Sequence, residues 1–430
     1  MFAKTLLKNF RKARPKFEVP QDVLLGWLAR AHLQAKIYQE GRDISVADVA
    51  NKEIEKMQKF VSRFACDAKR ISSRGIQTDD AYESDYQKMQ IYKITPTANS
   101  GLAMLARSQF FSKACNEIFE QFYPLASSAP EHIIHVTCTG YVSPSGAQHI
   151  VAQRNWNSQT AVTHAYHMGC YASLPALRMA QAISMSLPKK PADQAHEVSG
   201  VFGQAQIDIA HTELCSLHLN PADHSPEQIV VQSLFADGSI KYSVTHEETC
   251  VDAIQDSQSS QNLRSFEIFK IKEFIIPHTE KMMTWITADH GMQMTLAKEV
   301  PEQVAKHLIA FLKDFGLDFV GDTNLSTKAD AIADVSHRRV PRLDSKTCLF
   351  AIHPGGPRIL DSIQDLLKIS NDQIFHSKQV LFKYGNMSSA TLPHIWQEIL
   401  EDPSVDSGTN VMSLAFGPGL TIFGGLLKKL

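Results

Sequence analysis

The chain has 430 residues, of which 43% are hydrophobic and 20% are charged, as in soluble globular proteins with one large domain or two ordinary ones. The formal net charge of −2 argues against broad electrostatic binding to nucleic acid. No run of about 18 apolar residues and no secretory signal occur in the sequence, so we expect no stable membrane insertion.

The cysteines are scattered and form no CxxC pair: Cys66, Cys115, Cys138, Cys170, Cys215, Cys250 and Cys348. An odd number of dispersed thiols is typical of a reducing compartment. We therefore expect a cytoplasmic protein with free thiols and no structural zinc site.

The first residues, MFAKTLLKNFRKARPKF, carry six Lys or Arg and no acid. An amphipathic membrane-surface segment or a transit peptide is conceivable, but the segment is short and its apolar face is thin. We expect residues 1–19 to form a solvated basic arm, with the folded domain beginning near Pro20.

The N-terminal half predicts helices first and then a strand. Apolar residues at helical spacing predict a helix over Pro20–Glu40 and another near Val46–Phe64. A β-branched run within Glu131–Tyr141 predicts a buried strand followed by a loop. Further along, Gln228–Ser239 is an apolar stretch that ends in a turn.

The C-terminal part predicts further strands. Thr347–Pro357 is typical of a buried strand that runs into a Pro/Gly-rich loop, and Asn410–Leu427 of two strands joined by a Gly-Pro-Gly turn. Helices that alternate with strands indicate an α/β protein. Two polar stretches are expected to be insertions or surface loops, namely residues 252–262 and about 321–344, the latter containing the basic run SHRRVPR.

Cys170 follows a glycine in the stretch THAYHMGCYASLPALRMA (Thr163–Ala180). If a strand ends at residues 167–169 and a helix begins at Tyr171, unpaired N–H groups and the helix dipole favour the thiolate. A nucleophile on a rigid, buried helix is suited to carry an acyl group. From this segment alone, a buried core cysteine is the alternative.

Two further segments carry polar groups beside glycine turns. His353 follows a buried strand in AIHPGGP, and Asn386 follows Gly385 in YGNMSSA. Together a histidine and an asparagine can donate two hydrogen bonds to one oxygen, an arrangement suited to a developing enolate or oxyanion. Either residue alone is more often a cap or a turn residue.

The segments GCYASLPALRMA, LFADG, HPGGPRIL, GNMSSA and AFGPGL occur in this order. They resemble the active-site segments of the type III polyketide synthases, the chalcone and stilbene synthase family, over roughly Pro20 to the C-terminus. The resemblance implies a five-layered αβαβα thiolase-like fold of two similar halves, residues 20–250 and 251–430. The stretch GYVSPS departs from the plant pattern and is more similar to bacterial members.

The same resemblance implies a catalytic triad of Cys170, His353 and Asn386. The cysteine would be loaded with an acyl group from coenzyme A, and the other two would bind the thioester oxygen of malonyl-CoA during decarboxylation. The implied product is a small cyclic polyketide of the pyrone, resorcinol or phloroglucinol type. The substrates would be CoA thioesters, with no bound cofactor, and the protein would be a homodimer.

Other family positions carry over to this sequence one at a time. Phe235 matches an aromatic residue at the junction of tunnel and cavity, whereas Met294 stands where a second aromatic gatekeeper is usual. The resemblance also assigns to the cavity lining Cys215, His218, Ser388, Phe416, Gly417, Pro418 and Gly419. Lys59, Arg63 and Lys69 resemble the basic residues that contact the CoA phosphates, although a basic helical face is otherwise simply solvated.

Three alternatives stay open. A single-condensation enzyme of the 3-oxoacyl synthase III kind shares the triad, and the basic SHRRVPR segment could then dock an acidic acyl carrier protein. Cysteine peptidases also run Cys, His and Asn along the chain, but the local papain signature around the cysteine is absent. A non-catalytic acyl-binding scaffold is disfavoured by the intact triad. His211, Cys215 and His218 have metal-like spacing but no evident fourth ligand, so we expect no metal site.

Overall fold

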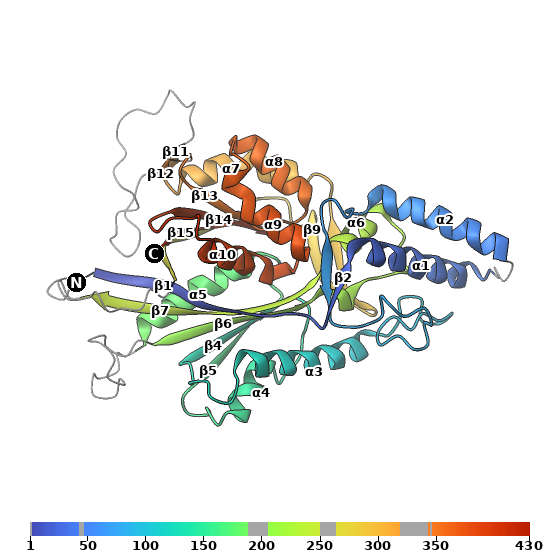
Figure 1. The fold of residues 1–430 in the computed structure, drawn as a ribbon, viewed down its shortest axis with the longest axis horizontal. Helices are drawn as coiled ribbons and strands as arrows, with labels where there is room; N and C mark the ends of the chain where they lie inside the picture. The colour runs from blue at the N-terminus through green and yellow to red at the C-terminus, as the bar shows by residue number, and fades with distance from the viewer. Residues whose placement is uncertain (1, 43–46, 188–204, 250–263, 319–342, 345) are drawn as a thin grey trace.

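The computed structural model describes residues 2–42, 47–187, 205–249, 264–318, 343–344 and 346–430. Five layers are visible in Figure 1. Outer helices cover two layers of strands, and a pair of central helices lies between the strands. The five-layered αβαβα arrangement predicted from the sequence is confirmed.

The strands form two similar sets. In the first set the order is β5-β4-β6-β7-β1, with parallel pairing among the first three strands and antiparallel pairing beyond. In the second set the order is β13-β14-β15-β8, again parallel first and antiparallel beyond. The strands of the first set are β1 (Phe2–Ala13), β4 (His132–Thr137), β5 (Ala161–Tyr166), β6 (Gln206–Leu214) and β7 (Asp237–Thr249). Those of the second are β8 (Phe266–Ile275), β13 (Leu349–Ile352), β14 (Asn410–Gly417) and β15 (Thr421–Lys429).

The two sets meet at strands β1 and β8, where Leu6 lies opposite Glu267 and Leu7 opposite Phe266. The expected join between the halves near residue 250 lies outside the described residues, as do the expected surface loops 252–262 and 321–342. Residues 343–344 form the short strand β12 (Leu343–Asp344), which pairs with β11 (Leu317–Asp318).

Two central helices hold the layers together. Helix α5 (Ser173–Ser186) contacts strands of both sets, and α10 (Thr391–Glu401) contacts β13 and β7. Apolar side chains from both helices, such as Leu174 and Trp396, are fully buried in one shared core. Each central helix begins just after a residue of the expected triad, Cys170 before α5 and Asn386 before α10.

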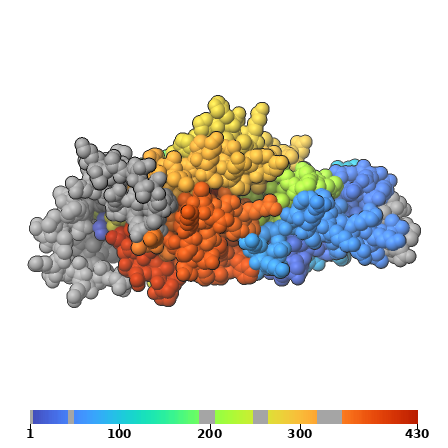
Figure 2. Space-filling model, turned by 90° about the horizontal axis from the view of Figure 1, so that it is seen from above, coloured from blue at the N-terminus to red at the C-terminus, as the bar shows by residue number. Residues whose placement is uncertain are grey.

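The remaining elements surround these layers. The outer helices are α3 (Met104–Phe122) and α4 (Gly146–Gln153) on one side, with α7 (Val300–Lys313), α8 (Pro357–Leu367) and α9 (Phe375–Tyr384) on the other. One end of the molecule is formed by α1 (Gln21–Glu40) and α2 (Ala47–Phe64), blue in Figure 2. The other elements are α6 (Pro226–Leu234), the paired strands β2 (Phe17–Pro20) and β3 (Ser73–Ile76), the hairpin β9 (Met283–Ala288) and β10 (Gly291–Leu296), and the 3-10 turns η2 (Cys215–His218), η4 (Asp372–Ile374) and η5 (Ser388–Ala390).

Most of the elements predicted from apolar spacing are confirmed. Helices α1 and α2, the buried strands β4 and β13, and the pair β14–β15 lie where the sequence predicts them. The stretch Gln228–Ser239 contains the end of a helix, a short bridge and the start of β7. The six described cysteines are free thiols, and Cys250 lies outside the described residues.

The prediction of a solvated basic arm is wrong for residues 2–13, which form strand β1 between β7 and β8. Leu6, Leu7 and Ala13 of this strand are buried, Leu7 completely. Its lysines meet acids that are distant in the sequence: Lys8 lies 3.2 Å from Glu247 and Lys12 lies 3.0 Å from Glu398. The charge run looked unpartnered because its partners come from other elements.

Leu7→Ala is expected to lower the free energy of unfolding by about 2–5 kcal/mol, because it leaves a cavity where the two sets of strands meet. Urea unfolding measures this change. Lys4→Ala on the same strand is the control, since its 3.8 Å ion pair is partly exposed and contributes less than about 1 kcal/mol. An unchanged free energy of unfolding for Leu7→Ala would contradict the buried strand and support the prediction of a solvated arm.

Candidate active site

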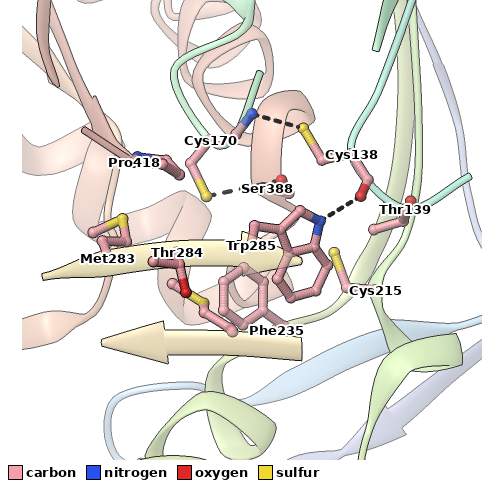
Figure 3. Close-up of a pocket in the computed structure, with 12 residues that line it drawn as sticks. Cys138, Thr139, Cys170, Cys215, Phe235, Met283, Thr284, Trp285, Ser388 and Pro418 are labelled. Atoms are coloured by element: carbon pink, nitrogen blue, oxygen red, sulfur yellow. Dashed lines mark hydrogen bonds between the residues drawn. The ribbon is translucent and has the colours of Figure 1, made fainter. Parts of the chain in front are cut away.

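A small cavity of about 30 Å³ lies where the two halves meet (Figure 3). Its walls come from the loop after β4, the turn before α5, the end of α6, the β9–β10 hairpin, and the segments after Asn386 and after β14. The lining residues are Cys138, Thr139, Gly169, Cys170, Cys215, Phe235, Met283, Thr284, Trp285, Met294, Ser388 and Pro418.

Cys170 lies in the turn between β5 and α5, three residues before the first residue of the helix. Gly169 has a φ of +89°, and a Cβ at this position would lie 2.6 Å from Pro418 Cδ. The Gly169 N–H donates to Cys138 Sγ at 3.0 Å. The glycine is therefore required both by its backbone conformation and by the close approach of Pro418.

The low pKa expected for the Cys170 thiol is not found. Burial raises its pKa to about 12, a hydrogen bond with Ser388 opposes this shift, and the Glu213 carboxylate adds to it. The Sγ and Ser388 Oγ atoms are 3.8 Å apart. Because desolvation disfavours a charged sulfur, the resting group is a neutral thiol.

Asn386 follows α9 and is held by its backbone against the end of α6. Its N–H donates to Leu234 O at 2.9 Å, and its carbonyl accepts from the Ala236 N–H at 2.8 Å. The side-chain oxygen accepts from the Ser388 N–H at 2.9 Å. This contact fixes the amide orientation and leaves Nδ2, which is buried and has no hydrogen-bond partner among the described residues.

His353 lies at the end of β13, where its N–H donates to Leu414 O at 2.8 Å. The side chain is buried, and neither ring nitrogen has a hydrogen-bond partner within the described part of the chain. Burial lowers the pKa of His353 to about 3, so the ring is neutral. A neutral imidazole has one donor and one acceptor, and both are unsatisfied here.

A series of contacts connects the three segments. After His353, the backbone at Gly356 packs against Leu234, because a Cβ there would lie 3.3 Å from Leu234 Cδ1. Leu234 in turn bonds the Asn386 backbone, and the Asn386 amide bonds Ser388, whose hydroxyl contacts Cys170. Contacts thus link the segments that contain His353, Asn386 and Cys170, and of these three side chains only Cys170 is among the residues that line the cavity.

Five of the residues expected in the cavity line it together with Cys170, as Figure 3 shows for most of them: Phe235, Met294, Cys215, Ser388 and Pro418. Phe416, Gly417 and Gly419 lie in the flanking strand and turn but not among the lining residues. Gly417 packs against the Tyr171 ring, and Gly419 has a φ of +127°, so both shape the turn that presents Pro418.

His218 does not line the cavity. Its Nε2 lies 2.7 Å from Thr139 O, and its Nδ1 accepts from the Met292 N–H at 3.1 Å. His211 lies in β6 and bonds Ser389 and Tyr242 at 3.0 Å each. Both histidines are therefore engaged in structural contacts, and no group of side chains in the described ranges could hold a metal ion.

Trp285 is the principal residue that the sequence analysis missed. It lies between Cys170 and Phe235 in Figure 3, and its indole N–H donates to Cys138 O at 2.6 Å. Its carbonyl accepts from His167 Nε2 at 2.7 Å. No motif in the segment TWITA indicates that Trp285 lines the cavity, because this position depends on the packing of a hairpin that is distant in the sequence from Cys170.

The three basic residues expected at the CoA phosphates are all exposed. Lys59 and Arg63 lie one turn apart on α2, and Lys69 lies in the turn beyond it. The guanidinium of Arg63 lies 5.4 Å from the centroid of the Phe64 ring. Separately, no helix in the described residues is long and apolar enough to cross a membrane.

Comparison with known sequences agrees with these observations. Residues 267–430 match the family of chalcone and stilbene synthases, C-terminal domain. The chain is 29% identical to Probable polyketide synthase 1 of Dictyostelium discoideum over 69% of this chain and 8% of that protein. It is 24% identical to Type III polyketide synthase C of Arabidopsis thaliana over 70% of this chain and 67% of the relative. For the 1,3,6,8-tetrahydroxynaphthalene synthase of Streptomyces coelicolor the identity is 23%, over 67% and 64%. The chain therefore spans less than two thirds of the first and third of these relatives.

Solved structures share the whole fold. The C-terminal type III polyketide synthase domain of Steely1, a type I/III hybrid from Dictyostelium, has a TM-score of 0.70 at 21% identity and covers 99% of both chains. A polyketide synthase from the brown alga Ectocarpus siliculosus has a TM-score of 0.74 at 17% identity, covering 100% of this chain and 99% of its own. Residues 267–430 thus match the chalcone and stilbene synthase C-terminal domain, and the whole chain is similar in sequence and fold to type III polyketide synthases.

Proposed function

We propose that the protein is an acyltransferase that loads an acyl starter from coenzyme A onto Cys170 and extends it by decarboxylative condensation with malonyl-CoA. The product would be a small pyrone, resorcinol or phloroglucinol. One observation carries the proposal: His353 and Asn386 have buried side-chain nitrogens with no hydrogen-bond partner among the described residues, in segments that contacts link to the half-buried Cys170 thiol. Buried polar groups without partners are costly, so such groups indicate a ligand oxygen.

Loading begins from two neutral groups. As Cys170 Sγ attacks the thioester carbonyl, its proton passes to the neutral His353 ring. The carbon–sulfur bond to coenzyme A then breaks, and the departing thiolate takes up the proton. A neutral resting pair supports this order, because burial disfavours both the free thiolate and the imidazolium.

Extension uses His353 and Asn386 as hydrogen-bond donors. When malonyl-CoA loses carbon dioxide, negative charge develops on the thioester oxygen, and hydrogen bonds from Asn386 Nδ2 and a ring N–H of His353 stabilise it. The resulting carbanion attacks the acyl carbonyl on Cys170, and the cysteine sulfur leaves. Neutral donors suit this step because no strong base is needed.

The size of the cavity favours a second candidate, a single-condensation 3-oxoacyl synthase III-like enzyme. A volume of about 30 Å³ leaves little room for a growing polyketide. Such an enzyme would accept its acyl group or extender from an acyl carrier protein. Counting two-carbon units in the product by mass spectrometry, with CoA or carrier-protein donors, separates one extension from several.

The proposal includes coenzyme A contacts and a homodimer. The exposed Lys59, Arg63 and Lys69 can neutralise phosphates at one end of the molecule. Strand β5 is the edge strand of the first set and pairs only with β4 among the described strands, so its outer edge can pair with a second copy of the chain.

Cys170→Ala is expected to abolish covalent loading. Intact-protein mass after mixing with short, long and aromatic acyl-CoAs should show an acyl gain for the wild type only. Cys66→Ala is the matched control, because this half-buried thiol does not line the cavity, and it should still be loaded. An adduct on the Cys170→Ala protein would contradict the assigned nucleophile.

Asn386→Ala is expected to separate the two half-reactions. Loading should persist, whereas malonyl-CoA decarboxylation, followed by release of labelled carbon dioxide, should fall by about 10²–10³ because one donor to the enolate oxygen is lost. Equal losses in both steps would show that Asn386 does not act in extension alone.

The reactivity of Cys170 should rise steadily with pH. A thiol with a pKa raised to about 12 is mostly protonated at neutral pH, so alkylation by iodoacetamide should increase about tenfold per unit between pH 7 and 9. Peptide mapping by mass spectrometry follows the modified cysteine. A plateau at neutral pH would instead indicate a thiolate–imidazolium pair.

A further inference from the structure

The β9–β10 hairpin forms one wall of the cavity and pairs with no other strand in the described part of the chain. It contributes a third of the lining residues: Met283, Thr284, Trp285 and Met294. Residues 264–318, which include it, project on one side of the molecule in Figure 2 (yellow to light orange). This wall is thus attached by side chains and loop contacts rather than by a continuous sheet.

The position of this wall decides which acyl groups fit. Cavities of about 150 Å³ accept a ligand the size of benzene, whereas the volume here is about 30 Å³. The opposite wall consists of Cys170 and Ser388, which lie next to the buried central helices. The hairpin contributes four of the twelve lining residues, so a shift of the hairpin would enlarge the space beside Cys170.

His218 joins this hairpin to the loop beside the nucleophile. Its Nδ1 accepts from the Met292 N–H at 3.1 Å, and its Nε2 donates to Thr139 O at 2.7 Å. A carbonyl oxygen can only accept and an N–H can only donate, so the contacts require the neutral ring with its proton on Nε2. Burial, together with the nearby Arg107 charge, lowers the pKa of His218 to about 3 and maintains that form.

The hairpin is shaped to receive this ring. Gly291 has a φ of +154°, and a Cβ there would lie 3.1 Å from His218 Nδ1. The Trp285 ring meets the His218 ring edge to face, with centroids 6.0 Å apart. Other bonds also hold the hairpin: Gln228 donates to Met294 O and His167 to Trp285 O. The Trp285 indole N–H donates to Cys138 O in the Thr139 loop, and His218 makes a second link to that loop with both nitrogens.

We propose that His218 is a positioning residue whose neutral Nε2–H ring pins the β9–β10 hairpin to the Thr139 loop and thereby restricts Cys170 to small acyl groups. This specificity role rests on the proposed acyl loading. The link from Met292 through His218 to Thr139, here called the pin, does not depend on it. His218 acts through Met292 and Thr139 and does not touch the acyl group.

Two variants separate the two halves of the pin. His218→Asn keeps an acceptor oxygen near the place of Nδ1 and so retains the Met292 contact, but it loses the donor to Thr139. His218→Gln keeps a donor near the place of Nε2 and loses the acceptor for Met292. The matched control is His290→Gln, a change on the same hairpin at a residue whose Nε2 has no hydrogen-bond partner among the described residues.

Three measurements are made on each full-length protein: hydrogen exchange at the β9–β10 amides, alkylation of Cys170 by a small and by a bulky haloacetamide, and mass gain with acyl-CoAs of increasing size. For His218→Gln we expect faster exchange at Met292, and alkylation by the bulky reagent about tenfold faster than in the wild type, as loss of one hydrogen bond predicts. The small reagent should react equally with all proteins. His218→Asn should stay closer to the wild type at Met292, and His290→Gln should match it throughout.

The outcomes distinguish the pin from the proposed function. If hairpin exchange and bulky-reagent alkylation in His218→Gln equal those of the wild type, the pin is overturned. If both rise but no protein takes up any acyl group, the pin stands and the proposed loading fails. If loading occurs but larger acyl groups gain nothing, the specificity role is overturned. Should His218→Gln fail to fold, Gly291→Ala presses on the same ring from the hairpin and is tested in the same way.

Discussion

The burial of helices α5 and α10 between two sets of strands is the constraint on which the site depends. Each helix is preceded by a turn that presents one polar group, Cys170 or Asn386, at the meeting of the halves. Side chains such as Leu174 and Trp396 are completely enclosed, so the helices cannot shift without opening the core. Cys170 and Asn386 are therefore placed by packing that is far more extensive than their own contacts.

The same burial sets the electrostatics of the site. Desolvation keeps Cys170 as a thiol and His353 as a neutral ring, because a charge on either would lose its hydration. Neutral groups with unsatisfied donors suit a reaction in which charge develops on a substrate oxygen and is absent at rest. The position of Cys170, three residues before α5, gives the helix dipole too little influence to overcome desolvation.

The β9–β10 hairpin completes the cavity, and it is not hydrogen-bonded into the large sheet. Strands β9 and β10 carry Trp285 and Met294 to the thiol and are attached through side chains such as His218 and His167. The cavity thus joins residues beside the buried central helices to residues of a hairpin that pairs with no other strand in the described part of the chain.

The sequence by itself determined the fold class and most of the helices and strands, because these depend on local spacing and on motifs whose residues are adjacent in the chain. The triad of Cys170, His353 and Asn386 stays a prediction. The sequence did not determine that the basic segment around Leu7 is a central strand. The acids that pair with its lysines, Lys8 and Lys12, come from β7 and α10, which are distant in the sequence. Nor did the sequence indicate Trp285 as a cavity wall, or His218 as a bridge rather than a lining residue. Only the tertiary structure decided these points, because each depends on which distant groups are brought into contact. The same holds for the pKa values of Cys170 and His353, which depend on how far each side chain is buried.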